Sequence, residues 1–380
     1  PAMWDRGTNR SLMDSDMLEV LHSLLNGGTS SVSWTNLYTC INQCNSVIKY
    51  APSVEMSDET RSYCLGNAYF VRAYVYYWIA RVWGDAPVIL TPTESTGREI
   101  YPSRSPRAEV YAQVAQDIES ALTHITSNAK GCYYATVDNI NMLKIAFALH
   151  VDATNEVHSA SYIQRFIWGS TQVKASYRNV EGGVPVSSNQ WFCYADEFIG
   201  ELKRNKEQNN DQRSDVTYME RTGVSDMYEK VGWPNKFTGD WSSGTLLYDD
   251  DLILYRYAQY YMFRAELYYY RKQYKEALGE LNVVAQRAYG KADFYTSATQ
   301  QDVLEALAAE NRWEFAEEGN LWFTYIRLGY IDTYCPLKYW PNTGVEGGVG
   351  GSTNPNIYLF PISTSAINKN SNLRQTEGWS

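Results

Sequence analysis

The feature that most constrains the fold is a helical period that runs through residues 249–329. Side chains that share one helical face recur at spacings of three and four, first in Ile253, Tyr257, Tyr260, Tyr261, Arg264, Ala265 and Tyr268. After a polar break at residues 271–273, the period resumes in Tyr274, Ala277, Leu278, Leu281 and Val284. Small residues stand where two helices could approach closely, at Ala265, Ala277 and Ala285. The pattern predicts two helices joined by a tight turn.

Such a helix pair is typical of a tetratricopeptide-type repeat. One pair cannot bury both of its faces, so neighbouring pairs are needed. The sequence predicts them, because similar patterns give helix pairs near residues 33–83, 105–155, 250–289 and 300–328. Residues 156–248 and 330–380 lack this period. We predict a mainly α fold with about four tetratricopeptide-like helix pairs packed against a less regular ligand-binding lobe, in a single domain over residues 1–380.

Two local signals define details of this fold. Ser57 precedes Asp58 and Glu59, which is typical of a helix N-cap, and the helix that follows is apolar nearly all round as far as Trp83. We therefore expect that helix at the centre of its neighbours. Near the C-terminus, the apolar run at residues 357–362 predicts a short strand.

Charge and hydropathy exclude several classes of partner. The net charge is −10 and the isoelectric point is about 5.1, which argues against nucleic acid and anionic membranes. No run of 18 apolar residues occurs, so no transmembrane helix is predicted. The six cysteines are irregularly spaced and only four histidines occur, so scattered thiols are expected and neither a metal site nor a cofactor is predicted.

Catalytic motifs are absent from the sequence. There is no Gly-x-Ser-x-Gly, phosphate-binding loop or His-Glu-x-x-His pattern. Glu314, Glu317 and Glu318 could supply the paired carboxylates that glycoside hydrolysis needs. The nearby Arg312 and Arg327 favour structural salt bridges instead, and no enzyme activity is predicted.

Binding is the remaining interpretation, and it concerns the isolated aromatic residues of the irregular segments. A sugar site needs a flat ring to stack on the sugar and planar polar groups to bind its hydroxyls. Each candidate could instead be a local packing anchor. Short segments that place a tryptophan beside such a polar group supply the candidates, which are Trp4, Asp5, Arg6, Asn189, Trp191, Trp233, Asn235, Asp240 and Trp241. The tryptophans of the helical motifs are expected to pack in the core: Trp34, Trp78, Trp83, Trp313 and Trp322.

Five patterns, in order along the chain, resemble the SusD/RagB family of outer-membrane nutrient-binding lipoproteins. They are Trp34–Tyr38 with Ile41, Asn45 and Ile48; Gly66–Tyr74 with Arg81–Pro87; Tyr255–Gln259 with Arg264–Glu266, Ala277–Leu278, Leu281–Asn282 and Arg287–Ala288; Asn311–Gly319 with Trp322 and Ile326–Gly329; and Asn356–Ile362 with Asn370–Trp379. Residues 156–248 match no pattern of the family. The chain is also expected to begin later than the family does, without its signal peptide, lipid-bearing cysteine and first helix.

The resemblance implies a cell-surface, carbohydrate-binding protein of nutrient uptake and polysaccharide utilization. Such a protein captures an oligosaccharide or polysaccharide and delivers it to a TonB-dependent, SusC-like outer-membrane transporter without cleaving it. Its only membrane contact would be the lipid anchor of the full-length protein. Three alternatives stay open at this point: a RagB-like protein that captures peptides, a helical-repeat scaffold that binds no ligand, and a glycosidase.

Overall fold

The computed structural model describes residues 3–4, 25–94, 101–128, 134–153, 193–194, 196–225, 228–234, 255–316, 318–336, 338–340, 345–347 and 352–379. The chain divides into two compact units. Unit 1 comprises Pro1–Leu24 and Ser161–Ser352, and unit 2 comprises Leu25–Ala160 and Thr353–Ser380. That residues 1–380 act as a single domain stays a prediction.

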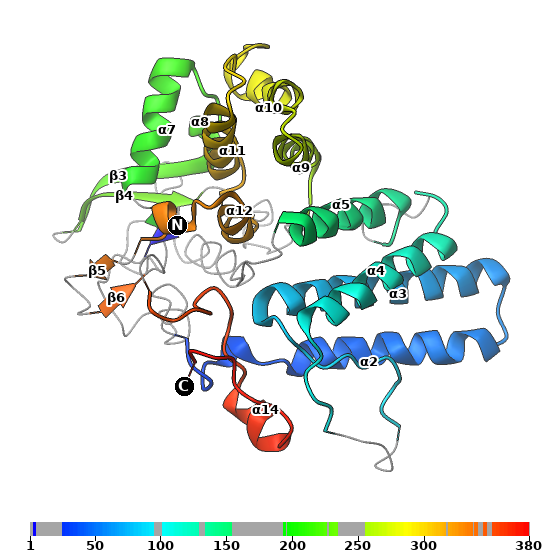
Figure 1. Ribbon diagram of the computed structural model, residues 1–380. Helices are drawn as coiled ribbons and strands as arrows, with labels where there is room; N and C mark the ends of the chain where they lie inside the picture. The colour runs from blue at the N-terminus through cyan, green and yellow to red at the C-terminus, as the bar shows by residue number, and fades with distance from the viewer. Residues whose placement is uncertain are drawn as a thin grey trace, which may run out of the picture. The chain divides into compact units, whose positions relative to one another are not determined.

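Both units are mainly α-helical, with short two-stranded sheets in unit 1 (Figure 1). Unit 2 contains 3₁₀ turns at Ser30–Val32 and Ala51–Ser53 and the helices α2 (Thr35–Tyr50), α3 (Asp58–Trp83), α4 (Arg107–His124), α5 (Val137–Ala153) and α14 (Thr364–Lys369). Unit 1 contains α7 (Asp196–Asn209), α8 (Ser214–Thr217), α9 (Tyr257–Tyr270), α10 (Tyr274–Tyr289), α11 (Gln300–Glu314), α12 (Leu321–Leu328) and α13 (Ile331–Tyr334). Its strands are β1 (Met3–Trp4), β2 (Cys193–Tyr194), β3 (Tyr218–Ser225), β4 (Tyr228–Pro234), β5 (Lys338–Trp340) and β6 (Val345–Gly347).

The four predicted helix pairs are confirmed as α2–α3, α4–α5, α9–α10 and α11–α12. In the pair α9–α10, the polar break forms a tight turn in which Lys272 adopts a left-handed backbone with φ of 60°. Ala265 and Ala277 are fully buried where α9 and α10 approach each other. Their core continues onto α11 through Leu281, Val303 and Leu307, so neighbouring pairs bury each other's apolar faces as a repeat requires.

Helix α3 lies at the centre of unit 2, as its apolar character predicted. It packs against α2 and α4 and also contacts α5. The Ser57 side chain caps its first turn by accepting a hydrogen bond from the Thr60 amide at 3.2 Å. At its other end, Gly84 adopts φ of 76°, a conformation that favours glycine.

The prediction of a strand at residues 357–362 is wrong. This segment forms a turn and then an extended stretch without strand pairing. The Phe360 amide donates to the Val82 carbonyl at 2.8 Å, and the Trp83 indole donates to the Pro361 carbonyl at 3.2 Å. The apolar side chains therefore cover the end of α3 instead of joining a sheet. Among the described helices, none is long and apolar enough to cross a membrane.

Candidate functional site

Two of the nine predicted ligand residues lie in described strands of unit 1. Trp4 belongs to β1 and Trp233 belongs to β4. The other seven lie outside the described residues: Asp5, Arg6, Asn189, Trp191, Asn235, Asp240 and Trp241. The side chains of Trp4 and Trp233 are also outside the described part, so the strands give their position through the backbone alone.

The strands β1 to β4 come together as one group, called the strand cluster below. Strand β1 pairs antiparallel with β2 so that Trp4 lies opposite Cys193. Strand β2 lies against β4, and β4 pairs antiparallel with β3 so that Trp233 lies opposite Met219. Predicted segments that are far apart in the sequence are therefore neighbours in unit 1.

Helix α7 contacts this cluster through an aromatic pair with β2. Tyr194 of β2 is fully buried, and its ring lies 5.0 Å from the ring of Phe198 at the start of α7. The apolar side chains of α7 follow a helical spacing in Phe198, Ile199 and Leu202. This helix was not identified from the sequence, although that spacing was available to find it.

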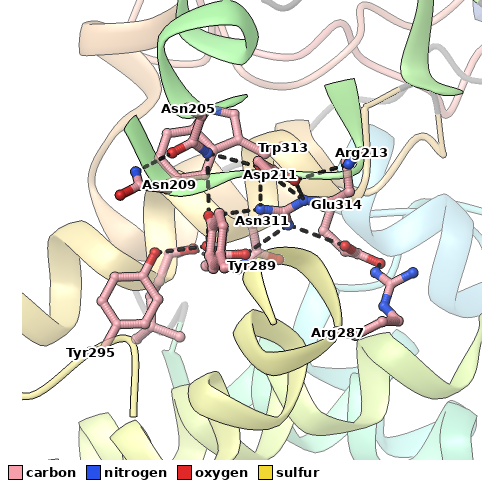
Figure 2. Close-up of polar contacts among 12 residues, drawn as sticks. Asn205, Asn209, Asp211, Arg213, Arg287, Tyr289, Tyr295, Asn311, Trp313 and Glu314 are labelled. Carbon is pink, nitrogen blue, oxygen red and sulfur yellow. Dashed lines mark hydrogen bonds and ion pairs between the residues drawn. The ribbon is translucent and has the colours of Figure 1, made fainter. Parts of the chain in front are cut away.

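A buried charged network lies where the chain leaves α7 and enters the β3–β4 hairpin, and we call it the Arg213 network (Figure 2). Arg213 donates to Asp211 from Nε at 2.9 Å and from Nη2 at 2.8 Å. Its Nη1 donates to Glu310 at 2.7 Å and to Glu314 at 3.2 Å. Burial alone would lower the pKa of Arg213, but Glu310 and Asp211 raise it, so the guanidinium stays charged.

Tyrosine hydroxyls complete the hydrogen bonding of the Arg213 network. Tyr289 accepts from Nη2 of Arg213 at 2.7 Å and donates to Glu310. Tyr295 also donates to Glu310, at 2.7 Å. Burial, and then the charge of Glu310, raise the pKa of both tyrosines, which keeps their protons in these hydrogen bonds.

Glu314 extends the network to two further arginines. Arg256 donates to Glu314 at 2.6 Å and to Glu318 at 2.5 Å, and Arg287 pairs with Glu314 as well. Burial opposes ionisation of Glu314, but the charges of Arg256, Arg287 and Arg213 outweigh it and lower its pKa. Glu314 is therefore a stable carboxylate rather than an acid that could donate a proton near neutral pH.

The prediction of structural salt bridges is confirmed for Glu314 and Glu318, which pair with arginines distant in the sequence. Arg312 pairs with Glu201 of α7 at 2.8 Å, and Arg327 pairs with Glu266 of α9 at 2.7 Å. Glu317 lies outside the described residues. Residues brought together by the tertiary fold have replaced the local pairs, and Asp211 and Arg213 were not identified from the sequence at all.

The expected packing roles of the helical tryptophans fit the structure. Trp34 and Trp83 are buried and meet edge to face at 6.2 Å, while Trp78, Trp313 and Trp322 are half-buried. Four cysteines of the described part are free thiols: Cys40, Cys44, Cys64 and Cys335. Within that same part, no group of three or more His, Cys, Asp or Glu side chains is placed to hold a metal ion.

Comparisons with known proteins agree with this architecture. A family model described as the SusD family matches residues 166–379, and another, described as starch-binding associating with outer membrane, matches residues 7–137. The Starch-binding protein SusD of Bacteroides thetaiotaomicron is 30% identical over 161 residues, which cover 42% of this chain. The matched stretch spans only 27% of that relative's length.

Solved structures resemble the fold along nearly the whole chain. A SusD superfamily protein from Bacteroides vulgatus gives a TM-score of 0.76 at 17% identity, covering 97% of this chain and 90% of its own. NanU of B. fragilis gives a TM-score of 0.72 at 21% identity, covering 100% of this chain and 90% of its own. At these identities the likeness concerns the fold.

The fold and the described site define a tetratricopeptide-like helical protein whose buried carboxylates are engaged with arginines and tyrosines. The chain belongs to the SusD family, since a model of that family matches more than half of it. The family resemblance inferred from the five sequence patterns is thus confirmed.

Proposed function

We propose that this chain binds an oligosaccharide or polysaccharide at the cell surface and delivers it to a TonB-dependent outer-membrane transporter without cleaving it. The observation that carries the proposal is family membership. One matching family model is described as starch-binding and associated with the outer membrane, and the curated relative from B. thetaiotaomicron is named a starch-binding protein. A lipid anchor in the full-length protein would hold it at the membrane.

We place the ligand site on the strand cluster of unit 1. Trp4 belongs to β1 and Trp233 belongs to β4, while Trp191 precedes β2 by two positions in the sequence. These three strands lie side by side. Aromatic rings in such a group could stack on successive sugar rings, and nearby amides and carboxylates could bind paired hydroxyls. The proposed contact residues are Trp4, Asp5, Arg6, Asn189, Trp191, Trp233, Asn235, Asp240 and Trp241.

A binding role without bond cleavage is supported by the state of the carboxylates in the described part. Glu310 and Glu314 are almost fully buried and are held by arginines. Retaining and inverting glycosidases both need two carboxyl groups that face the sugar, one of them able to give up a proton. Glu314, with its lowered pKa, is unsuited to that role.

The test is calorimetric titration against a panel of plant and host glycans and a peptide pool, followed by chromatography of each mixture. We expect saturable binding of one glycan class and no new products. Trp233→Ala should abolish that binding, whereas Tyr257→Ala, which removes an exposed aromatic ring from α9, should not. Binding of peptides alone would contradict the glycan assignment, and new reducing ends would contradict the absence of catalysis.

The transporter contact needs a separate test. The full-length lipoprotein should co-purify from outer membranes with a TonB-dependent transporter, at a stoichiometry that survives dilution. Recovery of the lipoprotein alone would contradict this part of the proposal and leave the glycan-binding part unaffected.

A further inference from the structure

The segment between α7 and β3 is short, and hydrogen bonds hold most of its residues. Asn210 ends α7 in a left-handed conformation with φ of 60°. The next residue, Asp211, accepts hydrogen bonds from Asn205 of α7 at 2.9 Å and from the Arg213 amide at 3.0 Å. The one-turn helix α8 follows at Ser214–Thr217, and β3 begins directly after it at Tyr218.

Arg213 is the residue through which this segment is bound to the helix pairs. Its guanidinium uses Nε, Nη1 and Nη2 together, and the acceptors come from the connecting segment, from α10 and from α11. Figure 2 shows Arg213 between Asp211, Tyr289 and Glu314. A planar fork with fixed partners on three segments leaves the side chain no alternative orientation.

Backbone hydrogen bonds connect the same segment to its surroundings. The Gln212 amide donates to the carbonyl of Ala288 in α10 at 3.0 Å. The Ser214 hydroxyl donates to the carbonyl of Leu202 in α7 at 2.6 Å. The Thr217 amide, next to β3, donates back to the Arg213 carbonyl at 2.9 Å. Arg213 is therefore linked by hydrogen bonds to the residue that precedes β3.

The first residues of β3 in turn face the end of β4 that carries Trp233. Tyr218 pairs with Pro234 and Met219 pairs with Trp233, ahead of the register shift between Thr222 and Ser225. The strand pairing closest to Arg213 is thus the pairing that holds Trp233. A displacement at the Arg213 network would reach Trp233 before it reached the tip of the hairpin.

We propose that Arg213 is a positioning residue that fixes the base of the β3–β4 hairpin on α10 and α11 and thereby orients Trp233 in the strand cluster. The ligand part of this inference rests on the proposed function, whereas the hairpin part does not. Arg213 does not contact the ligand in this proposal; it acts through the backbone of β3 and β4.

The composition of the network suits positioning better than it suits stabilisation. Replacing a buried ion pair with apolar residues is often neutral or stabilising, because burial of charge offsets the Coulomb attraction. What a fully satisfied polar network adds is a single geometry, since any displacement leaves a buried charge without its hydrogen bonds. An apolar contact at this place would tolerate sliding of the hairpin.

The test compares Arg213→Lys with Arg327→Lys by hydrogen exchange of the protein without ligand. Arg327 of α12 is a matched control in unit 1. Its side chain is about as buried as that of Arg213, and its Nε and Nη2 donate to Glu266 of α9. We expect Arg213→Lys to raise exchange at residues 218–234 by about tenfold, the effect of losing one buried hydrogen bond to a charged group. Arg327→Lys should instead affect α9 and α12.

A milder variant covers the case in which Arg213→Lys does not fold. Tyr289→Phe removes one hydroxyl that accepts from Arg213 and donates to Glu310, and it leaves every charge in place. It should raise exchange in the hairpin in the same direction, by a smaller factor. Unchanged exchange at residues 218–234 in both variants, or the same change in Arg327→Lys, would overturn the proposal.

The ligand part is measured on the same variants by titration with the glycan that the wild-type protein binds. Arg213→Lys should raise the Kd by about tenfold or more, as loss of supporting contacts does at other sites, while Arg327→Lys should leave it unchanged. Equal Kd values for wild type and Arg213→Lys would contradict the ligand part of the proposal. If the wild type binds no glycan, the proposed function fails, and the exchange experiment still decides whether Arg213 positions the hairpin.

Discussion

Substituting Asp117 by Ala would leave a buried guanidinium in unit 2 without its counter-ion. Asp117 of α4 accepts hydrogen bonds from Nε and Nη2 of Arg72 in α3, at 2.8 and 2.7 Å, and from Gln113 at 2.9 Å. The exposed fractions of the Arg72 and Asp117 side chains are 5% and 1%. Breaking such a pair from one side costs about 3–5 kcal/mol, so we expect unit 2 to lose that much stability.

The double variant of Arg72 and Asp117 tests the coupling between the two charges more sharply. Arg72→Met removes the other partner, so that adding Asp117→Ala to it leaves no buried charge unpaired. The second substitution should then cost clearly less than it does in the wild type, with a coupling energy of at least about 1.5 kcal/mol between the two residues. Additive losses would refute the account, because they would mean that the two charges do not depend on each other.

The assay must report on unit 2 alone, since the chain contains two compact units. Hydrogen exchange of amides in α3 and α4 meets that need. Glu119→Ala is the matched control, because Glu119 of α4 pairs with Lys144 of α5 while both side chains are largely exposed. It should leave the exchange of α3 and α4 unchanged.

Four further substitutions test close contacts and charges. Gly66→Ala should destabilise unit 2 by about 1–3 kcal/mol, because the added methyl would lie 2.7 Å from Cδ1 of Ile125. Gly279→Ala should stabilise unit 1 by about 0.5–1 kcal/mol, because open space surrounds this position on α10 and alanine favours a helix over glycine. Hydrogen exchange of amides in α3 and in α10 measures each unit separately, and stabilisation of unit 2 by Gly66→Ala would contradict the close approach. The lowered pKa of Glu314 means that its contribution is complete above the unfolded value of about 4.3 and is lost as the pH falls through the lower folded value. Urea unfolding of unit 1 between pH 7 and pH 3 should therefore show a shallower loss for Glu314→Gln than for wild type, and equal slopes would contradict the salt bridges. Arg213→Lys should loosen the hairpin, as described above.

The helix pairs could be predicted from the sequence because their signals are local. Spacings of three and four, the cap at Ser57 and the polar break before Tyr274 each involve residues within one or two helical turns. The apolar run at residues 357–362 shows the limit of such reasoning. A short apolar run is compatible with a strand or with a buried irregular segment, and here contacts with Val82 and Trp83 decided the outcome.

The Arg213 network could not be predicted because its members are distant in the sequence. Arg213 meets Glu310 across 97 positions and Tyr289 across 76 positions. The sequence indicated that Glu314 would be engaged in a salt bridge, but it favoured the neighbouring arginines. The aromatic segments of the candidate site were recognisable by composition, whereas the pairing of β1 with β2 and the contact of β2 with β4 are tertiary facts.

Titration of the wild-type protein with the glycan panel, followed by analysis of products, tests the central claim most directly. We expect saturable binding of one glycan class, unchanged glycan after incubation, and loss of binding in Trp233→Ala but not in Tyr257→Ala. Binding that survives in Trp233→Ala would contradict the site, and the absence of glycan binding by the folded wild type would contradict the proposed function.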